Sequence, residues 1–226
     1  PGTYTADVPV GFYTHVVGLG DSPDDVVFSG DKGVYCEEGN YYFAGGALDT
    51  FWRAAENFQT TSNHNWQVGS GMMWAVSQAA PLRRVHVKNE LLLFEYQPPY
   101  GAAGYASGGY LGNSQVDGKV VSGSQQQWFT RNSQLGGGWT SGVWNMVFAG
   151  CPGAPADHCG NKGGSPYSAV PTTTIAEKPF ISVDTSGKFW LNVPDLRKDA
   201  SGPDFSTPST RIGFENVYVA NNQTDT

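Results

Sequence analysis

The chain has 226 residues, a length at which all-β folds are commonly single domains. Its 13 Lys and Arg residues stand against 20 Asp and Glu residues, and the resulting net charge of −7, with no run of basic residues, argues against nucleic acid or an anionic membrane surface as a partner. Only 15% of the residues are charged while 13% are aromatic and 30 are Gly, which excludes a disordered chain and favours a rigid, turn-rich secreted domain.

Short strand signals, separated by Gly, Asn, Asp and Ser clusters, run along the first two thirds of the chain. Helix signals are almost absent, and the one candidate, residues 44–58, fits either a short helix or a strand flanked by loops. No apolar run reaches the ~18 residues of a membrane span. The start at Pro1 and the sequon at residues 222–224 agree with a mature secreted protein. Strands are predicted at residues 13–17, 25–28, 72–76, 84–87, 91–96, 116–121, 127–130 and 143–149.

A repeat of short motifs is the most informative feature of this region. The pair Asn113-Ser114 recurs 19 residues later as Asn132-Ser133, Phe129 recurs as Phe148 after another 19, and Arg84 precedes Asn113 by 29. Such spacing marks a solenoid whose coils stack to build one continuous core. We therefore predict an all-β, right-handed parallel β-helix of the single-stranded pectate-lyase-like architecture. A β-sandwich is the alternative fold. It is less favoured because its strands would show a cleaner alternation of apolar and polar residues and no repeat.

The last third changes character. Residues 166–179 are rich in Pro, Ser and Thr and predict an extended surface segment, and residues 180–193 predict a hairpin turning at Gly187. Residues 198–211 resemble a linker, and residues 213–220 a strand with no partner after it. The predicted organisation is a β-helix over residues 1–165, followed by a segment over residues 166–226 that leads towards a second β-helix outside this chain.

The three cysteines allow several readings. Cys151 and Cys159 enclose a Pro- and Gly-rich loop, and a disulfide closing that loop is the preferred prediction. Two free thiols, or a zinc site completed by His158, are the alternatives. Cys36 is left over and is expected to be buried.

Three segments resemble the family 55 glycoside hydrolases, which are exo-acting β-1,3-glucanases. These segments are WAVSQAAPL (Trp74–Leu82), ASGGYL (Ala106–Leu111) and QQWFTRN (Gln126–Asn132), in the order and approximate spacing of that family. The resemblance implies a tandem β-helix of which this chain is the N-terminal half. The active cleft would lie between the halves, with a Glu of the second half as general acid. Ala80 replaces a Thr of the family pattern and Gln125 is an extra residue, so the glucan cleaved is left open.

The resemblance assigns catalytic roles to Gln78 and Ser107, which would hold the attacking water. Inverting hydrolysis needs a proton donor and an activated water on opposite faces of the sugar. Because an amide takes up a proton poorly, Gln78 and Ser107 are accessories and the carboxylic acid must come from elsewhere. The alternative is structural, with both side chains hydrogen-bonded along the solenoid.

Further candidates would bind the polysaccharide. Gln126 and Gln127 belong to a polar run in which Gln125 and Gln127 would share one face of a strand, and an internal amide ladder is the alternative. Trp139 follows three glycines and is the Trp expected to be exposed as a sugar-stacking platform, whereas core packing is expected for most of the others.

The remaining ionisable residues receive structural interpretations. Glu56 is expected to form an ion pair with Arg53, and Asp21, Asp24, Asp25 and Asp31 are at most a loose calcium site. No cofactor is expected. The expected partners are an extracellular polysaccharide and the second β-helix half, with no nucleic acid and no membrane. A non-catalytic glycan-binding or structural β-helix and a polysaccharide lyase are the alternative functions.

Overall fold

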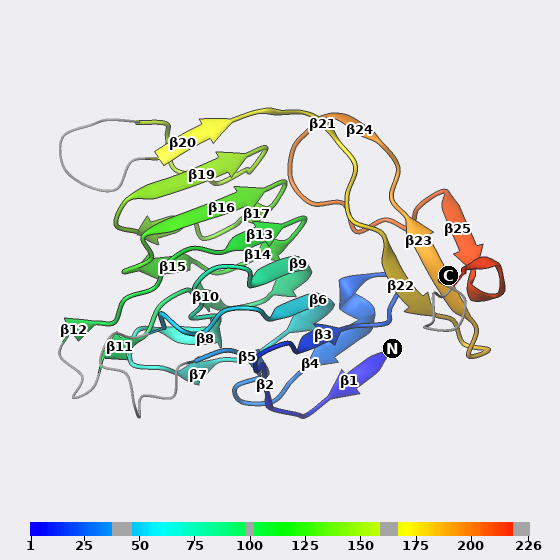
Figure 1. Ribbon diagram of the computed structural model, residues 1–226, viewed down its shortest axis with the longest axis horizontal. Coiled ribbons are helices and arrows are strands. Elements are labelled where there is room, and N and C mark those ends of the chain that lie inside the picture. The colour runs from blue at the N-terminus through cyan, green and yellow to red at the C-terminus, as the bar shows by residue number, and fades with distance from the viewer. Residues whose placement is uncertain (38–46, 98–101, 159–166, 219–226) are drawn as a thin grey trace, which may run out of the picture.

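The structure is a computed structural model that describes residues 1–37, 47–97, 102–158 and 167–218. Within these residues the chain forms β-strands and two short 3₁₀ turns, η1 (Pro23–Asp25) and η2 (Phe214–Asn216), and no α-helix (Figure 1). The predicted all-β class is therefore confirmed. Among the described elements there is no helix with the length and apolar character needed to cross a membrane.

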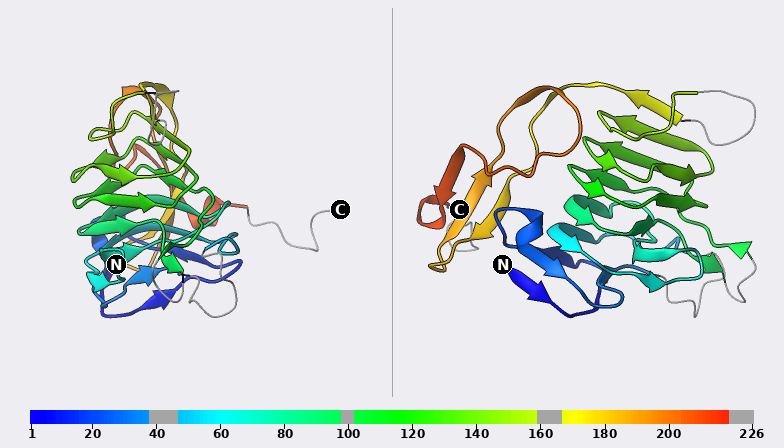
Figure 2. Two further views of the ribbon diagram at one scale, coloured as in Figure 1. Left: turned by 90° about the vertical axis from the view of Figure 1, so that its left-hand side faces the viewer. Right: turned by 180° about the vertical axis from the view of Figure 1, so that it is seen from behind.

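Parallel strands from successive coils form the main sheet, which rises from the N-terminus as a stack of arrows (Figures 1 and 2). A second parallel sheet lies behind it, and β7 (His64–Asn65) adds to that sheet in the antiparallel sense. The main sheet has the order β1 (Gly2–Tyr4), β4 (Val26–Phe28), β6 (Ala54–Thr60), β9 (Pro81–Val87), β13 (Tyr110–Gly112), β16 (Gln127–Arg131), β19 (Asn145–Ala149) and β20 (Tyr167–Val170), with β3 (His15–Val17) beside β6. The second sheet has the order β18 (Trp139–Ser141), β15 (Val120–Gly123), β10 (Glu90–Leu92) and β8 (Ser70–Met73).

Each coil in the middle of the stack consists of three straight sections. The chain runs through β13, bends at Asn113, continues as β14 (Gln115–Val116), turns into β15 and then reaches β16 directly above β13. The next coil repeats this path through β16, Asn132, β17 (Gln134–Leu135) and β18. The bends lie in register: Asn113 and Asn132 have φ angles of 49° and 45°, a left-handed conformation that Asn tolerates better than most residues.

The register tests the predicted repeat. Tyr110 pairs with Phe129, 19 residues further on, and Pro81 pairs with Tyr110 across 29 residues, so both spacings are confirmed. The step from Phe129 to Phe148 is wrong by one residue, because Phe129 pairs with Val147 and faces outward while Phe148 pairs with Thr130 and is buried. Since side chains alternate between the two faces of a strand, a shift of one residue exchanges inside and outside.

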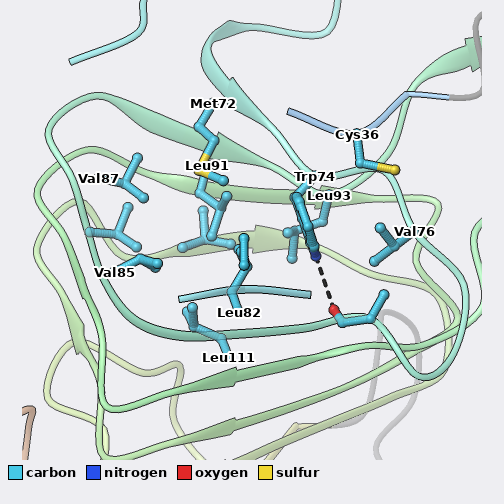
Figure 3. Close-up of a cluster of buried hydrophobic side chains, with 14 of the residues drawn as sticks. Cys36, Met72, Trp74, Val76, Leu82, Val85, Val87, Leu91, Leu93 and Leu111 are labelled. Atoms are coloured by element: carbon cyan, nitrogen blue, oxygen red, sulfur yellow. Dashed lines mark hydrogen bonds between the residues drawn. The ribbon is translucent and has the colours of Figure 1, made fainter. Parts of the chain in front are cut away.

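The core lies between the sheets and is built from inward side chains in adjacent coils. Leu82 and Leu111 pair across β9 and β13, and both are fully buried. Trp74 fills the centre, where its indole Nε1 donates a hydrogen bond of 3.0 Å to the carbonyl oxygen of Ala80 (Figure 3). This bond satisfies the one polar atom of a fully buried aromatic side chain and fixes the turn that precedes β9.

The short predicted strands need small corrections. Residues 91–96 are divided between β10 and β11 (Tyr96–Gln97), and residues 116–121 between β14 and β15. Gly118 lies between β14 and β15, where a Cβ would lie 2.5 Å from the carbonyl oxygen of Asn89. In residues 44–58 the strand alternative holds from Ala54, where β6 begins, while residues 44–46 lie outside the described part. The small pairs are β2 (Val8–Pro9) with β5 (Val34–Tyr35), and β11 with β12 (Ala102–Ala103).

The C-terminal segment forms antiparallel structure and runs back along the ends of the main strands (Figures 1 and 2). β22 (Phe180–Val183) and β23 (Phe189–Val193) form the predicted hairpin. The strand predicted at residues 213–220 is wrong in position: β25 (Thr210–Gly213) ends where that strand should begin, and η2 follows it. Because β25 pairs with β23, the final strand does have a partner. β21 (Thr172–Ile175) and β24 (Arg197–Ala200) form a second antiparallel pair.

Candidate functional site

The turn that leads into the main sheet stacks from coil to coil, and we call this stack the leading corner. Counting back from the paired residues of the strands aligns Tyr13, Trp52, Ala79 and Gly108 in one column. All four have left-handed backbones, with φ angles of 55°, 55°, 48° and 95°. The amide of Tyr13 donates to the carbonyl of Trp52 at 2.7 Å, which fixes the register of the first two turns.

Gln78 and Ser107, the two predicted catalytic residues, lie in this corner one residue before Ala79 and Gly108. Gln78 is exposed and has a φ angle of 49°, and its amide donates to the carbonyl of Gly108 at 3.1 Å. Ser107 is half-buried, and its amide donates to the hydroxyl of Ser77 at 2.8 Å. The backbone of each residue is therefore fixed by the neighbouring coil while the Gln78 side chain faces solvent.

An open cavity of about 560 Å³ lies over this part of the corner. Its polar side chains are Gln78, Ser107, Gln127, Arg83 and Tyr110, and the guanidinium of Arg83 lies 4.3 Å from the centre of the Tyr110 ring. The fold thus brings three predicted site residues together from coils 20 to 49 residues apart in sequence. No carboxylate belongs to the described residues that line this cavity.

The glutamine run divides into three different environments. Gln125 is fully buried: its Oε1 accepts from the amide of Gly108 at 2.9 Å, and its Nε2 donates to the carbonyls of Val76 at 2.8 Å and Leu93 at 2.9 Å. Gln127 is exposed in the cavity, and Gln126 is half-buried beside it. The expectation that Gln125 and Gln127 share one face is wrong, because β16 begins only at Gln127 and Gln125 still belongs to the turn.

Trp139 is not exposed. It retains 8% of its surface, and its ring centre lies 5.0 Å from that of Phe148 and 6.5 Å from that of Trp128 in the core. The glycines before it form a tight turn against the coil below, where a Cβ on Gly137 would lie 2.5 Å from the carbonyl carbon of Gly118. After this turn, Trp139 lies on the inner face of β18. The expectation that it is an exposed platform for a sugar is therefore wrong.

Exposed aromatic rings lie instead at the N-terminal end of the leading corner. Tyr13 is 82% exposed and Trp52 is 51% exposed, and their rings stack with centres 5.5 Å apart and planes at 26°. A cavity of about 360 Å³ beside them shares Ala79 and Pro81 with the Gln78 cavity. Sequence reasoning gave Tyr13 no role and favoured core packing for Trp52, because only the stacking of the coils reveals that both residues occupy the same turn.

The carboxylates take part in ion pairs away from the Gln78 cavity. Glu56 does not pair with Arg53 as expected: it accepts from Lys178 at 2.7 Å and lies 3.3 Å from His15, while Arg53 points inward and donates to the carbonyl of Val10 at 2.6 Å. Asp21 accepts from Arg211 at 2.7 Å, and Asp24 lies 2.6 Å from His86. Within the described ranges no group of three or more His, Cys, Asp or Glu side chains is placed to hold a metal ion, so the loose calcium site is not formed.

Cys36 is buried as predicted, and Cys151 is half-buried with no disulfide partner among the described residues. The Sγ of Cys151 lies 3.3 Å from the carbonyl of Ala149 and 3.5 Å from that of Thr130, and burial raises the pKa of this thiol. The predicted disulfide partner, Cys159, lies outside the described residues, so the bridge stays a prediction.

The opposite end of the main strands has a different character. The column of bends there contains Asn57, Arg84, Asn113 and Asn132, and we call it the asparagine bend. Arg84 donates to Asn57 at 3.0 Å and to the carbonyls of Asp21 and Asp204, both at 2.8 Å. Burial lowers the pKa of Arg84 to about 10, against the opposing effect of nearby acids such as Asp204. The asparagine bend is thus covered by the C-terminal segment.

Known proteins share this architecture. No protein-family model matches the chain. A curated exo-β-1,3-glucanase of Streptomyces sp. (strain SirexAA-E / ActE) is 45% identical over 224 residues, which is 97% of this chain and 34% of that relative. The chain thus spans about a third of the length of the relative it matches.

Two solved structures are also similar. The structure of sacteLam55A from Streptomyces sp. SirexAA-E superposes with a TM-score of 0.82 and 41% identity, covering 98% of this chain and 38% of that one. A variant of sacteLam55A in complex with glucose gives a TM-score of 0.77 at 41% identity, covering 94% and 36%. The chain is therefore similar over almost its whole length to part of an exo-β-1,3-glucanase, which confirms the resemblance to the family 55 glycoside hydrolases carried by its three motifs.

Proposed function

We propose that this chain is the N-terminal half of a secreted glycoside hydrolase that acts on a β-1,3-glucan or a related extracellular polysaccharide. The observation that carries the proposal is the leading corner, which gathers Gln78, Ser107 and Gln127 around one open cavity. The similarity to an exo-β-1,3-glucanase supports the substrate class. The parallel register and the three-section coils support the finer assignment of the fold as a right-handed parallel β-helix of the pectate-lyase-like type.

The proposed reaction is hydrolysis with inversion. In such a reaction a carboxylic acid protonates the leaving oxygen while a water attacks from the opposite face of the sugar. Gln78 offers an amide oxygen and two N–H donors, and Ser107 offers a hydroxyl, so together they can orient a water in the cavity. Neither can accept its proton readily. Both the acid and the base would therefore be carboxylates outside the described lining of the cavity.

The proposed organisation has the β-helix over residues 1–165 and a connecting segment over residues 166–226, although β20 at the start of that segment still pairs in parallel with β19 and so extends the main sheet. The connecting segment already contacts the asparagine bend through the backbone of Asp204 on Asn113, and Lys178 binds Glu56 next to Asn57. A second β-helix half would follow and would face the leading corner with the missing carboxylates. The partial coverage of the exo-β-1,3-glucanase supports such a second half.

The test is hydrolysis of laminarin, a soluble β-1,3-glucan, by the full-length protein that carries this chain. We expect release of glucose or a short oligosaccharide, first as the α-anomer in proton NMR spectra recorded during the reaction. Binding without any product would point to a non-catalytic glycan-binding module. A product with ultraviolet absorbance from a new double bond would identify a lyase instead. Ser107→Ala is expected to lower kcat by about tenfold or more, because it removes one of the groups that position the water.

A further inference from the structure

We infer that Tyr13 and Trp52 form a second subsite, which holds the part of a neutral β-glucan chain that extends beyond the Gln78 cavity. This inference rests on the proposed function and assigns a substrate-binding role to two residues outside that cavity. Three independent features carry it: the backbone conformation of the two residues, the exposure of their rings, and the continuity of their cavity with that of Gln78.

The left-handed backbone of the leading corner does not favour aromatic residues. Every turn in the column is left-handed, and further along the stack the same position holds Ala79 and Gly108. Glycine adopts this conformation freely, whereas a bulky side chain with a positive φ angle is strained. Tyr13 and Trp52, both at 55°, therefore carry a conformational cost that a glycine, as at Gly108, would avoid. Strain of this kind persists where the side chain serves a ligand site.

The ring of Trp52 packs on other aromatic rings, while much of the surface of Trp52 and Tyr13 is exposed to solvent. The ring of Trp52 meets that of Phe51 edge to face, with centres 4.9 Å apart, and Phe51 meets Phe12 at 5.4 Å. Yet Trp52 keeps half of its surface and Tyr13 most of it. The exposed rings thus gain little from burial in the core. A rigid, supported pair of exposed rings is suited to stack against the C–H face of a sugar ring.

The two cavities form one path along the corner. Ala79 and Pro81 line both, so a chain that leaves Gln78 passes directly over the aromatic pair. The charged groups of the aromatic cavity are engaged with the protein: the guanidinium of Arg53 binds the carbonyl of Val10, and His15 lies beside Glu56. A wall of aromatic and aliphatic groups, with its few charges compensated, favours a neutral glycan over an acidic polysaccharide or a phosphorylated ligand.

The test separates a long substrate from a short one. Tyr13→Gly and Trp52→Gly keep the left-handed turn and remove the rings. In the full-length protein, laminarin would contact both cavities, whereas laminaribiose is short enough to occupy the Gln78 cavity alone. We expect each variant to lower kcat/KM for laminarin by about three- to tenfold, mainly through KM. The value for laminaribiose should change by less than about twofold, and the Tm should stay the same or rise because glycine relieves the strained turn.

Phe189→Ala is the matched control, because Phe189 is another exposed ring, 44% accessible, on β23 of the C-terminal segment. This variant should leave both substrates unaffected. Equal losses on laminarin and laminaribiose, or a loss that follows a fall in Tm, would overturn the inference by making the rings structural. Unchanged kcat/KM for laminarin in an active protein would also overturn it while the proposed function stands. If the wild-type protein cleaves neither substrate, the proposed function fails, and weaker laminarin binding by the two variants in calorimetry would still support the subsite.

Discussion

Both ends of the main strands contain turns with left-handed φ angles, but the side chains of these turns have different environments at the two ends. At the asparagine bend, Asn57 and Asn113 adopt left-handed φ angles of 59° and 49°, and their amides bind backbone groups of other segments. At the leading corner, Tyr13, Trp52 and Gln78 adopt similar angles, but their side chains face solvent.

The environment of each side chain indicates whether the strained residue stabilises the fold. A strained residue whose side chain makes buried hydrogen bonds recovers free energy within the fold. A strained residue with an exposed side chain recovers little of this free energy, and we propose that at Tyr13, Trp52 and Gln78 a ligand accounts for the residue type. Asn132 is an instructive exception within the asparagine bend, because its fully buried amide finds no hydrogen-bond partner among the described residues.

The largest effect is expected at Gln125, the buried support of the leading corner. Gln125→Ala removes three hydrogen bonds and leaves the amide of Gly108 and the carbonyls of Val76 and Leu93 without this partner. We expect the free energy of unfolding to fall by about 3–5 kcal/mol, measured by urea denaturation. Gln126→Ala, at the half-buried neighbour, is the control and should change it by less than about 0.5 kcal/mol. Similar small effects for both variants would show that the corner does not depend on the buried amide.

Asn113→Ala is the next largest change, and it breaks the asparagine bend. The amide of Asn113 donates to the carbonyl of Asp204 at 3.1 Å and accepts from the amide of Asp204 at 2.6 Å. Its loss leaves a strained alanine and two unpaired groups, so we expect a loss of about 2 kcal/mol in thermal or urea unfolding. Asn113→Gly should lose less, because glycine removes the strain. Equal losses for the two variants would contradict the role given to the left-handed backbone.

The pH dependence of stability tests the polar contacts beside the asparagine bend. Burial raises the pKa of Asp117, but hydrogen bonds from Lys88 and Gln115 and the charge of His86 outweigh it and hold the pKa below the ordinary value of 3.8. A carboxylate with a lowered pKa stabilises the fold above its unfolded pKa, and this contribution is lost as the pH falls through the folded pKa. Asp117→Asn should therefore cost up to about 1 kcal/mol at pH 7, and this cost should shrink as the pH falls below 3.8 and disappear below the folded pKa. A cost that does not change with pH would contradict an electrostatic origin.

The smallest expected effect is a gain. Ala79 has the left-handed φ angle of its column, 48°, without a side chain that makes hydrogen bonds. Ala79→Gly should raise the free energy of unfolding by about 1 kcal/mol, visible as a higher Tm in calorimetry, because glycine relieves the strain at this turn. A lower Tm would mean that the methyl group contributes more than the strain costs, and would weaken the comparison of the two corners.

The sequence predicts the class of the fold and much of its register, because the spacing of the Asn-Ser pairs reports the length of each coil. Through the family motifs it also singles out Gln78 and Ser107, which line one cavity in the structure, while their catalytic role stays a prediction. It fails where the direction of a side chain depends on a turn, as for Trp139, which glycines turn into the core. It misses the pairing of Tyr13 with Trp52, because these residues lie 39 positions apart and meet only when coils stack. Period-2 alternation gives no information about Gln125, which lies just outside its strand.

One comparison tests most directly whether the leading corner binds the glucan while the asparagine bend stabilises the fold. Laminarin hydrolysis and thermal stability are measured for Gln78→Ala and Asn113→Ala in the full-length protein. We predict that Gln78→Ala lowers kcat/KM by at least about tenfold with an unchanged Tm, because the variant removes an exposed side chain that we propose to orient the water. Asn113→Ala should lower the Tm and keep kcat/KM within about twofold at temperatures where it remains folded. Full turnover by Gln78→Ala would contradict the assignment of the leading corner as the glucan site.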